Sequence, residues 1–238
     1  MKKTLAALAA ISAISALPAV SYAEDSPLSF NVSLTSDYRY RGISQTRLKP
    51  ALQGGVDYAL PGGFYLGAWG STIKWIKDGG GDSDVEIDLY GGYKGAITDA
   101  LGFDVGVLTY QYPSNDLSPS ANTTELYGAL SYGPATLKYS HSTTNLFGAP
   151  DSKNSYYVDL SASFDVGGFG VVPHVGYQSV KNSSGLSYTD YSITVTKDWS
   201  GFTFGAALVG TDTTAYASPV NGKDLGKDGL VLSVKKTF

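Results

Sequence analysis

Two segments contain residue types that could perform chemistry. HSTTN, residues 141–145, places His141, Ser142 and Asn145 close together, as the activation of a hydroxyl nucleophile would require. The flanking residues alternate between apolar and polar types, which predicts a β-strand over 135–143. Because adjacent residues of a strand point to opposite faces of the sheet, His141 cannot reach the Ser142 hydroxyl to activate it. The segment therefore does not predict a catalytic pair.

The second segment is KDGGGDSD, residues 77–84, where three aspartates in a glycine-rich loop could ligate calcium. It lacks a glutamate at the spacing of an EF-hand, so we interpret it as a solvated loop. The other histidine, His174, has no recognisable serine and acid partners in the sequence, and the chain has no cysteine that could form a thiolate metal site. We expect a protein that is not an enzyme and that requires no metal or cofactor.

Period-two alternation is the dominant pattern of the chain. In FNVSLTSDYRYRGISQT, residues 30–46, apolar Phe30, Val32 and Leu34 share one phase, and polar residues occupy the other. No segment after Glu24 has a helical period. The alternation predicts twelve strands, at residues 30–42, 51–60, 63–76, 84–94, 101–112, 123–132, 135–143, 155–166, 169–180, 188–199, 202–211 and 229–238.

Short and long connections alternate between these strands. Tight turns are expected at 61–63, 133–134, 167–168 and 200–201, and the other connections are mostly longer. Short turns at one rim and long loops at the other are typical of an outer-membrane barrel. A closed barrel of twelve strands is also too wide for side chains to fill, so an apolar interior would leave a void. We therefore predict an all-β fold, a transmembrane antiparallel up-and-down β-barrel, with the apolar phase facing lipid and the charged phase facing the lumen.

The N-terminal segment predicts export. Lys2 and Lys3 precede an apolar run that ends at Ser21-Tyr22-Ala23, the pattern of a cleaved signal peptide over residues 1–23, which leaves residues 24–238 as the barrel. Without the two lysines, 15 basic residues face 21 acidic ones, a net charge of −6 that disfavours nucleic acid as a partner. Charged residues make up only 16% of the chain, against roughly 25% in soluble domains, which also favours a membrane barrel.

Several motifs resemble one family of membrane proteins. SLTSDYRYRGISQT, PALQGGVDY, DVEIDLYGGYKG, TELYGALSYGPATLKYS and LVLSVKKTF occur in this order, and the pattern from Thr35 to Gln45 is the most specific. Together they resemble the TorF family of proteobacterial porins over essentially the whole mature chain. The resemblance implies an outer-membrane barrel that acts as a pore, and it implies no particular solute.

The lumen phase collects ionisable residues that would line such a pore. They are Asp37, Arg39, Arg41, Asp57, Glu86, Asp88, Lys94, Asp104, Glu125, Lys138, Asp159, His174 and Asp190. Charges inside a barrel need water or each other, because unpaired burial is costly. One interpretation is a narrow, passive, water-filled channel for small polar solutes or ions, weakly selective for cations. The alternative is a network of ion pairs that fills the lumen of a structural or surface-binding barrel without transport.

Two further expectations concern particular residues. Asp37, Arg39 and Arg41 should form a ladder up one lumen wall, because alternate strand residues share a face. Phe238 ends an amphipathic last strand and should act as the signal recognised by the barrel-assembly machinery. Interfacial aromatic girdles beside the outer-membrane lipids are expected from Tyr38, Tyr40, Tyr58, Tyr93, Tyr139, Tyr156, Tyr177, Tyr191 and Trp199.

Overall fold

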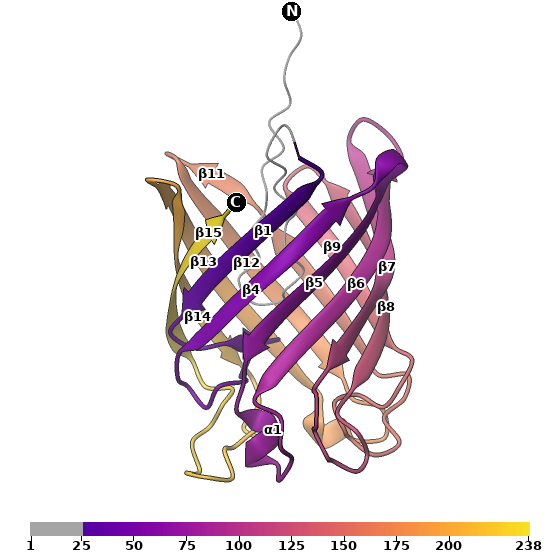
Figure 1. Cartoon of the computed structure of the whole chain (residues 1–238), viewed down its shortest axis with the longest axis vertical. Helices are drawn as coiled ribbons and strands as arrows, with labels where there is room; N and C mark the ends of the chain where they lie inside the picture. Colours follow the sequence, from indigo (N-terminus) through magenta and orange to yellow (C-terminus); the bar gives the residue numbers. More distant parts are fainter. Residues whose placement is uncertain (1–25) are drawn as a thin grey trace, which may run out of the picture.

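Each strand alternates between apolar and polar residues and pairs antiparallel with its neighbours, and the sheet formed in this way closes on itself. The computed structural model describes residues 26–238, and in it the first barrel strand pairs with the last, Asn31 lying opposite Thr237 (Figure 1). The predicted signal peptide, residues 1–23, lies outside the described residues. Closure removes every free sheet edge, which is the condition for a β structure to cross lipid.

The closed sheet contains thirteen strand segments. They are β1 (Leu28–Thr35), β4 (Ala51–Ala59), β5 (Phe64–Thr72), β6 (Val85–Ala96), β7 (Leu101–Gln111), β8 (Thr123–Tyr132), β9 (Ala135–Ser142), β10 (Tyr156–Ala162), β11 (Phe164–Val166), β12 (Phe169–Ser179), β13 (Tyr188–Trp199), β14 (Phe202–Thr211) and β15 (Gly229–Thr237). Since β10 and β11 are separated only by Ser163 and both pair with β12, they form one strand of the barrel. The predicted barrel of twelve strands is confirmed.

The two phases of alternation separate the outer face from the lumen. Outward side chains such as Leu34, Leu52 and Leu230 are more than half exposed, at 52%, 58% and 59%. Lumen-phase residues on the same sheet, such as Asp57 and Glu86, are buried at 3% and 1% exposure. A closed barrel that is apolar outside and polar inside places the chain in the outer membrane. Among the described residues, no helix is both long and apolar enough to cross a membrane.

Two predicted strands end earlier than expected. Strand 30–42 stops at Thr35, and the following residues leave the wall to form a short hairpin of β2 (Arg39–Tyr40) and β3 (Ile43–Ser44). Strand 63–76 stops at Thr72, before the one-turn helix α1 (Trp75–Asp78) that the sequence analysis missed. Two 3-10 turns, η1 (Pro61–Gly63) and η2 (Ser184–Leu186), complete the elements.

The two rims differ in the length of their connections. Turns such as Gly133-Pro134 and Ser200-Gly201 lie at the rim where β15 ends, at the top of Figure 1. The longer loops and α1 lie at the opposite rim. Phe238 closes the first rim through its backbone, which exchanges hydrogen bonds of 2.8 and 3.2 Å with Phe30. Its role as an assembly signal stays a prediction.

We expect the long-loop rim to face the cell exterior, because bacterial barrels of even strand number carry short turns on the periplasmic side. An epitope inserted at Gly80, Ser118 or Gly222 should be labelled on intact cells. All three residues are exposed, and space around Gly80 and Gly222 is open. An epitope at Gly167, in a short turn, is the control and should be labelled only after the outer membrane is broken. The reverse labelling pattern would contradict this topology.

Candidate functional site: the barrel lumen

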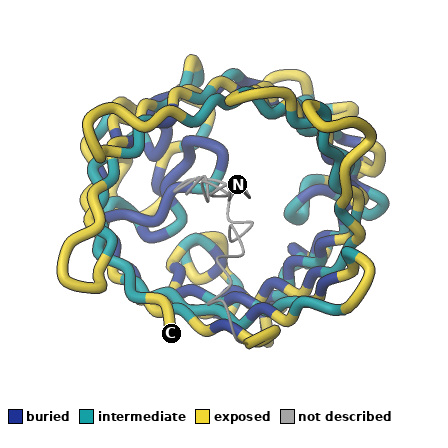
Figure 2. Tube along the Cα trace, turned by 90° about the horizontal axis from the view of Figure 1, so that it is seen from above, coloured by how far each residue is buried: buried dark blue, intermediate teal, exposed yellow. Residues whose placement is uncertain are grey.

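A segment that folds inward after β1 is the main feature of the lumen. We call residues 36–50 the inner loop; it contains the β2–β3 hairpin. The hairpin turns at Arg41 and Gly42, which both have positive φ, at 45° and 80°. Buried segments of the chain pass inside the ring of strands in the view along the barrel (Figure 2). The predicted wall ladder of Asp37, Arg39 and Arg41 is therefore wrong, because β1 ends before it.

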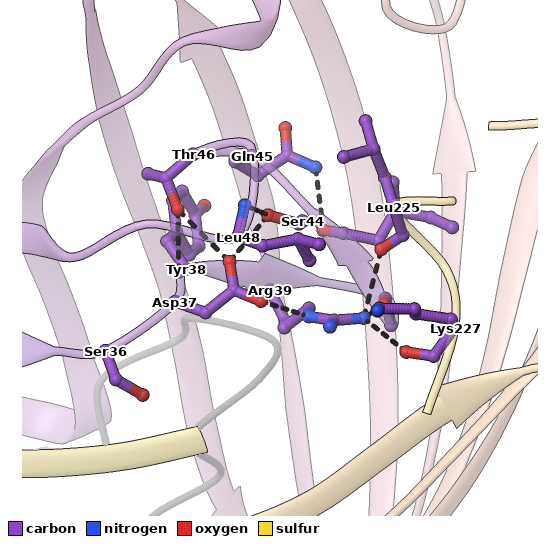
Figure 3. Close-up of polar contacts among 12 residues, drawn as sticks. Ser36, Asp37, Tyr38, Arg39, Ser44, Gln45, Thr46, Leu48, Leu225 and Lys227 are labelled. Atoms are coloured by element: carbon purple, nitrogen blue, oxygen red, sulfur yellow. Dashed lines mark hydrogen bonds and ion pairs between the residues drawn. The ribbon is translucent and has the colours of Figure 1, made fainter. Parts of the chain in front are cut away.

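Asp37 organises the base of the inner loop. Its carboxylate accepts hydrogen bonds from Arg39 Nε at 2.5 Å, Ser44 Oγ at 2.5 Å and Thr46 Oγ1 at 3.2 Å (Figure 3). The carboxylate thereby joins both arms of the hairpin. These local bonds give the backbone an alternative to the sheet ladder and explain why β1 does not continue.

Arg39 fastens the inner loop to the loop between β14 and β15. Its Nη1 donates to the carbonyl oxygens of Gly42, Leu225 and Lys227 at 2.9, 3.0 and 3.0 Å (Figure 3). A second attachment joins Arg47 to Asp78 of α1 in a bidentate ion pair. The inner loop is thus held at both sides by neighbouring loops of the long-loop rim.

Arg41 reaches across the lumen to the opposite wall. Its guanidinium forms a bidentate ion pair with Glu125 of β8, at 3.0 and 2.7 Å, and donates to Gln178 Oε1 of β12 at 2.6 Å. The Tyr157 ring lies beneath the guanidinium, 4.2 Å from its central carbon. Both charged side chains are almost fully buried, so this contact links three parts of the barrel within the lumen.

Two tyrosines of the inner loop face β6 and β7. Tyr38 donates from its hydroxyl to Glu86 Oε1 at 3.1 Å, and the hydroxyls of Tyr40 and Tyr110 are 2.6 Å apart. Burial raises the pKa of both the Tyr38 and the Tyr40 hydroxyl well above the ordinary value of a tyrosine. Their expected place in a lipid-facing girdle is wrong, because both lie with the inner loop.

Nearer the short-turn rim, the wall carries further polar clusters. Tyr90 donates to Asp57 at 2.5 Å, and Tyr65 donates to Asp104 at 2.6 Å. The ammonium groups of Lys94 and Lys138 lie 5.5 and 4.3 Å from the ring centres of Tyr65 and Tyr127. The lumen at this level is lined by tyrosines whose hydroxyls bind carboxylates.

His174 lies between two carboxylates. Its Nε2 is 2.5 Å from Asp159 and its Nδ1 is 3.6 Å from Asp190, while Tyr157 donates to Asp190 at 2.9 Å. Glu86 and Asp88, both on β6, form no ion pair within residues 26–238 and are 1% exposed each. Within the same range, no group of three or more His, Asp or Glu residues could hold a metal ion.

The structure distributes the predicted residues over two settings. Asp37, Arg39 and Arg41 belong to the inner loop, and the ten others lie on barrel strands in the lumen phase. Arg41 forms an ion pair with Glu125. His174 lies beside both Asp159 and Asp190. Glu86 and Asp88 take part in neither of these contacts. Ser44, Thr46 and Gln178 could not be predicted from the sequence, because their neutral side chains carry no signal of their role. Whether these residues line a pore stays a prediction.

Comparison with known proteins identifies a family and a fold. The family model described as "Bacterial protein of unknown function (Gcw_chp)" matches residues 21–238. No curated protein sequence matches the chain. The chain is similar to the structure titled "KdgM porin in complex with disordered oligogalacturonate", with a TM-score of 0.55, 7% identity and coverage of 89% of this chain and 98% of that one. It is also similar to "NanC porin structure in rhombohedral crystal form", with a TM-score of 0.54, 12% identity and coverage of 88% and 98%. The chain therefore has a porin-like barrel.

Proposed function

From the premise that this chain belongs to the Gcw_chp family of bacterial proteins of unknown function, we propose that it forms a narrow, passive, water-filled pore for small polar solutes or ions. The observation that carries the proposal is a closed barrel whose lumen phase carries ionisable residues on β4, β6, β7, β8, β9, β10, β12 and β13, because charges inside a barrel need water or each other. The resemblance to the TorF porins agrees with this function. We propose no catalytic role.

The charges of the lumen favour small cations. Nine acidic side chains of the lumen phase face five basic ones, of which Lys235 lies on β15; the acids are Asp37, Asp57, Glu86, Asp88, Asp104, Glu125, Asp159, Asp165 and Asp190, and the bases are Arg39, Arg41, Lys94, Lys138 and Lys235. The KdgM porin is in complex with oligogalacturonate, which is a polyanion. A net acidic lumen repels polyanions, so we propose a different solute class for this chain.

We propose that the inner loop forms the constriction of this pore. It reaches from β1 to β8 and β12, and its contacts with Glu125 and Gln178 cross the lumen. The same contacts favour the second candidate function, a barrel without transport. If the Arg41–Glu125 pair holds the inner loop in place permanently, the barrel would serve as a structural or surface-binding protein.

Single-channel recording separates the two candidates. The folded protein in a planar bilayer should give discrete conductance steps, and a salt gradient should give a reversal potential on the cation-selective side. A folded, heat-modifiable protein that inserts and never conducts would favour the barrel without transport.

The acidic pair on β6 is the part of the lumen set that no basic residue within 26–238 compensates with an ion pair, so its removal tests the cation selectivity directly. Replacing Glu86 by Gln and Asp88 by Asn is expected to shift the reversal potential toward zero while the barrel stays folded. The matched control is Asp82→Asn with Asp116→Asn, which removes two charges from exposed loops of the long-loop rim. The control should shift the reversal potential less. Equal shifts would show that selectivity arises at the mouth rather than at β6.

A further inference from the structure

Outward-facing aromatic side chains surround the barrel at the short-turn rim. Every barrel strand except β9 and β15 contributes at least one there, counting β10 and β11 together, and Phe238 directly follows β15. They are Phe30, Tyr58, Phe64, Tyr93, Phe103, Tyr132, Phe164, Phe169, Trp199, Phe202, Phe204 and Phe238. Such a ring is the usual girdle of a barrel at the membrane interface and needs no further explanation.

At the long-loop rim, outward aromatic rings occur on only one side of the barrel. They lie on four adjacent strands, β9, β10, β12 and β13, and we call them the external aromatic arc: Tyr139, His141, Tyr156, Tyr177 and Tyr191. The other strands present aliphatic or small residues near this rim, for example Leu34, Leu52, Val85, Leu126, Leu208 and Leu230. A general interfacial role would not confine the rings to one side.

Four of the five rings of the arc form a connected set, and Tyr191 is not part of it. Ring centres are 6.1 Å apart for Tyr139 and His141, 5.7 Å for Tyr139 and Tyr156, and 6.5 Å for Tyr156 and Tyr177. His141 is held by Asn154 Oδ1 at 3.2 Å from Nε2 and by the Tyr139 hydroxyl at 3.1 Å from Nδ1. Because Asn154 Oδ1 only accepts, Nε2 carries the proton and Nδ1 accepts from Tyr139. The result is an ordered, exposed surface of rings.

Two lysines lie on the loops that continue from the arc. Lys153 belongs to loop 143–155 and Lys181 to loop 180–187; both are exposed, and neither forms an ion pair within residues 26–238. The two loops are joined, because Asn182 Nδ2 donates to the Asp151 carbonyl at 3.0 Å and the Lys181 amide donates to Ser155 Oγ at 2.9 Å. Asp151 is the single acid on these loops. The two loops therefore carry two lysines and one acid, while on the β13 side of the arc Asp228 accepts a hydrogen bond from the Tyr191 hydroxyl at 2.8 Å.

We propose that the external aromatic arc, with Lys153 and Lys181 beyond it, binds the phosphate-bearing headgroup of a glycolipid in the outer leaflet. The rings offer flat apolar faces and hydroxyls at the depth of the sugar units, and the lysines offer point charges for phosphate. A second copy of this chain fits less well, because an isologous contact would bring the same lysines of two copies together. The inference is independent of whether the lumen conducts.

Lipid binding to the folded barrel tests this proposal. Purified bisphosphorylated lipid A should bind in native mass spectrometry and raise the temperature at which the folded band unfolds on a gel. Dephosphorylated lipid A, a phosphatidylglycerol control and inorganic phosphate should bind at least about tenfold more weakly. Equal binding of all the lipids would overturn the proposal, and so would a lipid-independent dimer, which would assign the arc to a second copy.

Variants locate the binding on the protein. Lys153→Gln with Lys181→Gln should weaken lipid A binding about tenfold, whereas Lys49→Gln with Lys223→Gln should leave it unchanged. Both control lysines are also exposed; Lys49 lies at the end of the inner loop and Lys223 in the loop between β14 and β15, outside loops 143–155 and 180–187. Tyr139→Leu with Tyr177→Leu keeps the surface apolar and should also weaken binding, because it removes two rings. If the two lysine pairs behave alike, the phosphate does not bind here.

Discussion

Replacing Arg41 by Gln is expected to raise the conductance of the reconstituted barrel several-fold and to lower its free energy of unfolding. Arg41 is the side chain that joins the inner loop to β8 and β12. Its loss leaves the Glu125 carboxylate, 1% exposed, with the Tyr110 hydroxyl at 3.2 Å as its one remaining side-chain hydrogen-bond partner within residues 26–238. Removing one member of a buried ion pair costs about 3–5 kcal/mol, and movement of the inner loop would let water reach Glu125 and reduce that cost.

A double-mutant cycle distinguishes a specific effect of the Arg41–Glu125 ion pair on conductance from a general loss of packing. Glu125→Gln alone should also raise the conductance, because it leaves Arg41 without its carboxylate. The Arg41→Gln, Glu125→Gln protein should conduct less than either single variant, because two amides leave no buried charge unpaired. Folded single variants that conduct like the parent protein would show that the pair holds the barrel together without controlling passage.

The barrel could be predicted from the sequence because the features that determine it, residue alternation and short turns, are local in sequence. Strict alternation determines which face of each strand meets lipid, and short turns such as Gly133-Pro134 determine neighbouring pairs. Predicted strands 123–132, 188–199 and 202–211 coincide with β8, β13 and β14. Closure between β1 and β15 follows once the apolar faces must all point outward.

The inner loop could not be predicted in the same way. Apolar residues resume at Tyr38 and Tyr40 after one polar residue, Ser36, in the apolar phase, so the pattern contains only a single-residue break. The hydrogen bonds around Asp37 act together with contacts distant in sequence, such as those of Arg39 with Leu225 and of Arg41 with Glu125. A further local signal was Gly42 after Arg41, a residue pair that suits a turn with positive φ. Tertiary partners therefore overrode a valid strand pattern.

That turn provides the second test, in which Gly42→Ala should displace the inner loop. Gly42 has a φ of 80°, and an added Cβ would lie 2.5 Å from Thr211 Cγ2 and 2.8 Å from Asp190 Cβ. The backbone conformation costs roughly 1–2 kcal/mol for alanine, and overpacking adds about 1–3 kcal/mol. Because β13 and β14 belong to the rigid wall, we expect the hairpin to move instead.

Gly222→Ala is the matched control, because Gly222 has a φ of 68° and an added Cβ would meet no atom within 4 Å. Both variants share the backbone cost, so any difference between them reports the contact of the hairpin with Asp190 and Thr211. In Gly42→Ala alone, trypsin should cleave after Arg41, which is 3% exposed in the parent protein, and the conductance should rise. Cleavage after Arg41 without a rise in conductance would show that the inner loop moves but does not obstruct the path. If Gly42→Ala resists trypsin as well as Gly222→Ala does, the β2–β3 hairpin has kept its position and β13 and β14 have moved instead. One of the two must move, because the added Cβ cannot be accommodated without a shift.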